Sequence, residues 1–232
     1  MISHKHRTIF VHIPKCAGTS IEMMFLKDLG LDYEHRAPLL LRPNDKVSLG
    51  PPRLAHLAAV EYVEHHYISD SLFNNYFKFS VVRNPIRRTL SFYKYLGYSR
   101  VMPLSQFVQY ELMSLFEKRK GLYWFVRPQA SFVCDKDGKT IVDCIYKLEN
   151  INESLSEIAQ RSNLDNPVLE HSNKSSDQIF RHKLIQTVKL IMSGSFSLNP
   201  FFTKNQVFTA NDICVLKRLY ERDFDLFEYD IK

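Results

Sequence analysis

Residues 12–20 read HIPKCAGTS and combine the features of an anion-binding loop. A β-rich apolar run, residues 7–13, stops at Pro14, and apolar residues at helical spacing follow from Ile21. Backbone N–H groups at the start of a helix, together with the helix dipole, bind phosphate-like groups. The segment therefore predicts a phosphate-binding loop between a strand and a helix.

The position of the lysine in this loop restricts the chemistry. Lys15 follows Pro14 directly, whereas the lysine of a Walker A motif would stand where this chain has Thr19. A lysine at position 15 reaches a bridging or leaving oxygen rather than a terminal phosphate. A P-loop kinase or NTPase is therefore the weaker alternative, and a nucleotide-binding protein without catalysis is another.

The loop resembles the 5′-phosphosulfate-binding loop of sulfotransferases that use 3′-phosphoadenosine-5′-phosphosulfate (PAPS). The resemblance is to the carbohydrate branch, related to heparan sulfate 2-O-sulfotransferases and small bacterial relatives, whose loops usually read HIPKTGGTS. Cys16 and Ala17 depart from that pattern. The resemblance implies transfer of a sulfuryl group to an acceptor hydroxyl, with 3′-phosphoadenosine-5′-phosphate (PAP) as product. It also implies that Lys15 stabilises the departing phosphate oxygen. The loop residues expected to contact the donor are Lys15, Cys16, Ala17, Gly18, Thr19 and Ser20.

A second stretch, VVRNPIRRTLSFYKY, is similar to the 3′-phosphate motif of the same family. The resemblance assigns the 3′-phosphate to Arg83, at a strand end, and Ser91, two turns into the next helix. A guanidinium and a hydroxyl can share one phosphate in this way. Arg88 and Tyr93 also match, while Arg87 stands where the family often has an acidic residue and receives no role.

The transfer needs a base for the acceptor hydroxyl, and histidine is suited to this task near neutral pH. His56, in LAHLAAVEY, matches the setting of the base histidine in related carbohydrate sulfotransferases. The alternatives are a structural His56 and Glu61 as the base. His12 belongs to the loop motif and is expected to order it.

Further stretches extend the resemblance over nearly the whole chain: RPQASFVCDKDGK, VDCIYKLENI, LEHSNKSS and the C-terminal residues 208–229. In the third of these, Lys174 is expected to contact the donor in a loop that closes on the nucleotide. For Gln129, Glu149 and Lys174, a structural role and a ligand contact are equally compatible with the sequence.

The elements that position these residues recur as strand–loop–helix units, which predicts an α/β fold. We expect a single P-loop-like domain over residues 1–232, with a central, mainly parallel sheet flanked by helices. Thr19 and Glu22 fit a capping box for the first helix. Asn84 and Pro85 fit the start of the second. Other expected elements are a helix over residues 105–119, a hairpin over 131–150 and a final helix over 210–227.

Composition narrows the classes of function further. The chain has 232 residues, of which 45% are hydrophobic, enough for a sizeable core. Its net charge of +6 is spread along the chain, which argues against a nucleic-acid binder and suits a glycan or another hydroxyl acceptor. No apolar run is long enough to cross a membrane, so a cytoplasmic location is expected.

The cysteines and paired histidines do not predict a metal site. The four cysteines lack the spacing of metal ligands and are expected to be reduced. His65 and His66 are adjacent on an expected helix, where neighbouring side chains point apart. The expected reaction needs no metal, because lysine, arginine and backbone N–H groups meet the charge of the donor.

Overall fold

The computed structural model describes residues 1–165 and 207–230, which form two compact units. The first unit contains Met1–Arg83 and the stretch that begins at Gln129, and the second contains Asn84–Pro128 and the C-terminal stretch. The chain thus leaves the first unit directly after Arg83. The assignment of residues 1–232 to a single domain stays a prediction.

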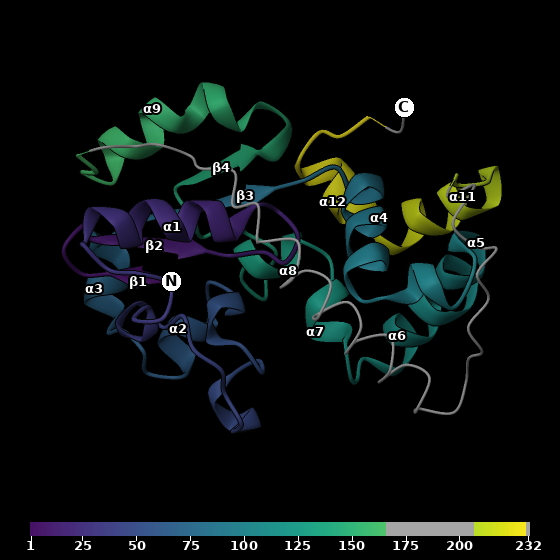
Figure 1. Cartoon of the computed structure of the whole chain (residues 1–232), viewed down its shortest axis with the longest axis horizontal. Helices are drawn as coiled ribbons and strands as arrows, with labels where there is room; N and C mark the ends of the chain where they lie inside the picture. Colours follow the sequence, from purple (N-terminus) through teal and green to yellow (C-terminus); the bar gives the residue numbers. More distant parts are fainter. Residues whose placement is uncertain (166–206, 231–232) are drawn as a thin grey trace. The chain divides into compact units, whose positions relative to one another are not determined.

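The first unit is built on a four-stranded sheet with the order β1-β2-β3-β4 (Figure 1). The strands are β1 (Ile2–Ser3), β2 (Thr8–Val11), β3 (Phe77–Val82) and β4 (Cys144–Lys147). β1 is antiparallel to β2, whereas β2, β3 and β4 are parallel to one another. The predicted α/β class with a mainly parallel central sheet is confirmed, as are the strands expected from residues 7–13 and 77–83.

Helices flank this sheet and bury its apolar side chains. Phe10 of β2 stacks on Phe79 of β3 with ring centroids 5.0 Å apart, and Phe25 and Ile158 join them in one buried cluster. The two long helices α1 and α9 thereby pack against the sheet. The helical segments of this unit are α1 (Gly18–Asp28), η1 (Ala37–Leu39), η2 (Val47–Leu49), η3 (Leu54–His56), α2 (Glu61–Glu64), α3 (Asp70–Asn75), α8 (Ala130–Val133), η6 (Leu148–Asn150) and α9 (Ile151–Arg161).

The described part of the second unit is helical and has its own core, formed around Phe92, Tyr93, Phe107 and Tyr220. Its segments are α4 (Pro85–Tyr95), η4 (Tyr98–Arg100), α5 (Leu104–Gln106), the π-helical η5 (Phe107–Leu112), α6 (Met113–Lys118), α7 (Tyr123–Val126), α11 (Ala210–Leu219) and α12 (Glu221–Leu226). Asn84 caps α4 by accepting the N–H groups of Ile86 and Arg87, as predicted.

Two predicted helices have an internal irregularity. The helix expected over residues 105–119 is present, but its middle is π-helical at Phe107–Leu112. The helix expected over residues 210–227 is divided into α11 and α12 by Tyr220, whose φ of −119° lies outside the helical range.

The hairpin expected over residues 131–150 is wrong in its first arm. Ala130–Val133 is a helix, and a single bridge joins Cys134 to Thr140. The Asp135 carboxylate closes this turn locally by accepting two backbone N–H groups, and β4 pairs with β3 instead. The four cysteines, all among the described residues, are thiols and not disulfides, as expected.

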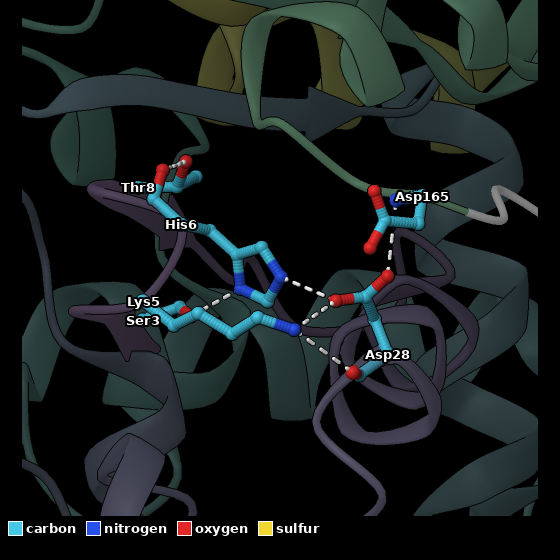
Figure 2. Close-up of polar contacts among 6 residues, drawn as sticks. All are labelled: Ser3, Lys5, His6, Thr8, Asp28 and Asp165. Atoms are coloured by element: carbon cyan, nitrogen blue, oxygen red, sulfur yellow. Dashed lines mark hydrogen bonds and ion pairs between the residues drawn. The ribbon is translucent and has the colours of Figure 1, made fainter.

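A polar cluster fixes the end of α1 to the N-terminal strands (Figure 2). The Asp28 carboxylate lies 2.9 Å from Lys5 Nζ and 2.8 Å from His6 Nε2, and it accepts the Asp165 N–H at 3.0 Å. Ser3 Oγ lies 2.6 Å from the other ring nitrogen of His6. Burial raises the pKa of Asp28, but these donors outweigh it and lower the pKa to about 2.

Candidate active site

The loop between β2 and α1 has two residues in the left-handed backbone region. Lys15 has a φ of 69° and Ala17 a φ of 57°, a conformation that costs a residue with a Cβ about 1 kcal/mol. α1 begins at Gly18, no side chain caps it, and its first turn contains no acidic residue. The start of this eleven-residue helix therefore suits an anionic group.

The predicted capping box of α1 is wrong. Ala17, not Thr19, is the N-cap, and the Glu22 carboxylate lies 2.6 Å from His12 Nδ1. Both side chains are buried, with 6% of Glu22 and 9% of His12 exposed. A buried carboxylate needs a strong partner, and the imidazole at the end of β2 provides a better one than the helix terminus.

His12 also packs closely against the loop. A Cβ added at Gly18 would lie 2.0 Å from His12 Cδ2, so only glycine fits there without displacing the ring. His12 is held on its other side by Glu22. This contact fits the loop-ordering role expected for His12.

His56 lies at the end of η3 and is buried against His12. Its Nδ1 is 2.9 Å from the main-chain oxygen of His12, and the two rings meet edge to face with centroids 4.4 Å apart. Because a carbonyl only accepts, Nδ1 carries the proton and the lone pair of the neutral ring is on Nε2. Burial, followed by the charge of His12, holds the pKa of His56 well below 6.5.

Glu61, the alternative base, has a local structural contact. Its Oε2 accepts the N–H of Ala58 at 2.6 Å, at the start of α2. The carboxylate is thus engaged in closing the turn that follows η3.

Gln129 joins the loop to the end of β3. Its Oε1 accepts the Arg83 N–H at 2.9 Å and lies 3.2 Å from Cys16 Sγ, while its Nε2 donates to the Arg83 oxygen at 2.8 Å. Arg83 Nη1 makes a long contact of 3.5 Å with the Lys15 oxygen. Lys15, Cys16 and Arg83 are therefore brought together in the first unit.

The protein family is identified by a match over nearly the whole chain. A model of the sulfotransferase family matches residues 1–230. The chain belongs to the sulfotransferase family. No curated protein and no solved structure matches it significantly. Sulfuryl transfer is the activity that this membership supports.

Two further residues, Ser91 and Lys174, are predicted to bind the donor. Ser91 is half-buried in α4, which belongs to the second unit. Lys174 lies outside the described residues. Their donor contacts stay predictions.

The other two arginines of residues 81–95, the predicted 3′-phosphate motif, have separate environments. Arg88 is buried and donates to the main-chain oxygens of Phe125 and Arg127, so it holds that segment in place. Arg87 is exposed.

Glu149 is exposed after the end of β4, which contrasts with the buried Gln129.

Sequence reasoning missed two partnerships in this sulfotransferase. The pairing of Glu22 with His12 had a usable signal, because a charged residue on the apolar face of a helix needs a nearby partner. The contact of Gln129 with Cys16 and Arg83 had no local signal, since it joins residues 113 and 46 positions apart.

Neither a metal nor a membrane span is indicated in the described part of the sulfotransferase. In residues 1–165 and 207–230, no group of three or more His, Cys, Asp or Glu side chains is placed to hold a metal ion. The helices in these same ranges are too short or too polar to cross a bilayer.

Proposed function

We propose that this sulfotransferase moves the sulfuryl group of PAPS to a hydroxyl of a carbohydrate, with His56 as general base. The observation that carries the proposal is the link made by His12. Its ring packs on Gly18 of the loop, and its main-chain oxygen orients the His56 ring. The loop proposed to bind the donor and the proposed base thereby belong to one unit.

The loop would bind the 5′-phosphosulfate of the donor. The start of α1 supplies backbone N–H groups and the positive end of a helix dipole. Lys15, half-exposed in the same loop, would neutralise the charge that develops on the departing phosphate oxygen. By resemblance to the family motif, Arg83 and Ser91 would bind the 3′-phosphate.

His56 would accept the proton of the acceptor. The acceptor oxygen attacks sulfur, the bond between sulfur and the bridging phosphate oxygen breaks, and PAP leaves. The hydroxyl proton passes to His56 Nε2, the nitrogen on which the neutral ring has its lone pair. The low pKa of His56 keeps the ring in this proton-accepting form at neutral pH.

The carbohydrate acceptor is supported by the resemblance of the loop to the carbohydrate branch of the family. A cationic chain, with a net charge of +6, also suits a polar or acidic glycan. A screen of transfer of radiolabelled sulfate to sugars, lipid-linked oligosaccharides and phenols tests this assignment. Label on phenols alone would overturn it.

Nucleotide binding separates this function from the alternatives. We expect PAP to raise the melting temperature clearly and ATP with Mg²⁺ to raise it far less. The reverse order would favour a P-loop kinase or NTPase. Binding of PAP without transfer to any acceptor would favour a nucleotide-binding protein that lacks catalysis.

A further inference from the structure

We propose that Gln129 is a positioning residue for the donor, acting through the main chain of Arg83 and the thiol of Cys16. The inference rests on the proposed function, because it assigns to Gln129 a part in holding PAPS. Gln129 has no exposed surface, so its own side chain is placed to hold protein groups rather than to meet solvent.

The carboxamide of Gln129 uses both its acceptor and its donor. Oε1 receives the Arg83 N–H and faces the Cys16 thiol, at 2.9 and 3.2 Å, and Nε2 donates to the Arg83 oxygen at 2.8 Å. An amide is the one uncharged side-chain group that offers an acceptor and a donor side by side. Replacing it would remove the partner of the Arg83 N–H and oxygen in these part-buried contacts, which is costly.

Gln129 is itself fixed by its own segment. It is the N-cap of α8, and its main-chain oxygen accepts the Phe132 N–H at 3.0 Å. The Phe132 oxygen in turn accepts the Ala59 N–H at 2.7 Å, three residues after His56. The amide is therefore presented from a segment with several main-chain attachments.

The groups held by Gln129 are adjacent to the charges proposed to bind the donor. Cys16 directly follows Lys15, whose ammonium group is one of these charges, and the guanidinium of Arg83 is the other. If the amide is lost, the loop and the strand end can shift against each other. A displacement of about 1 Å at such groups is enough to reduce catalysis about a hundredfold.

The test replaces Gln129 with methionine, which is similar in size but has neither the donor nor the acceptor. Dissociation constants for PAP are measured by calorimetry, and unfolding midpoints without ligand are measured in parallel. We expect Gln129→Met to weaken PAP binding about tenfold or more at a temperature where the variant is folded. The matched control is Gln160→Met, at an exposed position of α9, which should bind PAP like the wild type.

The Cys16 side of the contact provides an independent test if Gln129→Met does not fold. Cys16→Ser keeps a hydrogen-bond donor for Gln129 Oε1, whereas Cys16→Ala removes it. We expect the alanine variant to bind PAP about threefold to tenfold more weakly and the serine variant to recover most of that loss. Where Gln129→Met does fold, adding Cys16→Ala to it should have no further effect.

The results separate this inference from the proposed function. If the wild type does not bind PAP, the proposed function is overturned and this inference with it. If the wild type binds PAP and the folded Gln129 and Cys16 variants bind it equally well, the positioning role is overturned and the proposed function stands. A loss of thermal stability without a change in PAP affinity likewise overturns the positioning role.

Discussion

His56 donates its Nδ1 proton to the main-chain oxygen of His12, 2.9 Å away. The contact fixes which ring nitrogen has the lone pair, and it uses the residue whose own ring packs on the loop glycine. The orientation of the proposed base and the shape of the proposed donor site thus depend on one residue.

Replacement of His56 by alanine should abolish transfer without removing the donor site. We expect kcat to fall by about 10² to 10⁴, because a general base is lost, while the PAP dissociation constant changes little. Single-turnover transfer and calorimetry measure the two quantities. Glu61→Gln is the matched control and should retain most activity. The reverse pattern would assign the base to Glu61.

The pH profile should reflect the low pKa of His56. Burial and the charge of His12 favour the neutral ring, so it remains able to accept a proton as the pH falls through 6.5. We therefore expect the acid limb of kcat/KM, measured at saturating PAPS, to lie below pH 6.5. A half-maximal value at or above 6.5 would show that His56 does not govern this limb.

Arg83→Ala should weaken PAP binding about tenfold to a hundredfold, because charge-assisted hydrogen bonds to a phosphate are lost. The two hydrogen bonds from the Gln129 side chain should persist, since they are made to the main chain of residue 83. Arg87→Ala removes an exposed charge of the same sign four residues further on and should leave the affinity within about twofold. Equal affinity for PAP in the wild type and both variants would refute the assignment of Arg83.

Two neighbouring substitutions in the loop should have opposite effects. Ala17→Gly relieves a left-handed backbone at a cost in chain entropy, so the free energy of unfolding should stay equal or rise by up to about 1 kcal/mol. Gly18→Ala places a Cβ 2.0 Å from His12 Cδ2 and should lower stability by about 1 to 3 kcal/mol. Chemical denaturation measures both, and a neutral Gly18→Ala would show that His12 can move away.

Asp28 should contribute to stability in a pH-dependent way. Its folded pKa of about 2 lies below the ordinary 3.8, so its contribution is fully present above about pH 4 and is lost as the pH falls towards 2. Asp28→Asn should therefore cost about 2 kcal/mol at neutral pH, and the difference from the wild type should shrink in acid. Asp32→Asn, at an exposed position near α1, should cost less than about 0.5 kcal/mol. A pH-independent difference between wild type and Asp28→Asn would contradict the role of the carboxylate charge.

Local sequence signals predicted the elements that surround the loop. The apolar run before Pro14 forms β2, and Asn84 and Pro85 start α4, because these signals act within a few residues. The hairpin prediction failed because the turn near Asp135 is a local feature, whereas the partner of β4 is β3, more than sixty residues earlier in the chain.

The side-chain partnerships of the site were harder to predict. Glu22 has the spacing of a capping residue, yet the fold places it beside His12, where burial decides the contact. The contacts of Gln129 connect three distant segments, so no window of sequence contains them. The loop motif predicted which residues form the site. The side chains that hold those residues in place are brought to them only by the folded chain.

The Gln129 amide also takes the place that a neighbouring strand would occupy. By pairing with both the N–H and the oxygen of Arg83, it extends the hydrogen bonding of the sheet one residue past the end of β3. Because these hydrogen bonds involve only main-chain atoms of Arg83, they do not depend on the side chain at position 83. A substitution at position 83 should therefore change which ligand groups this strand end can meet while the hydrogen bonds to Gln129 remain.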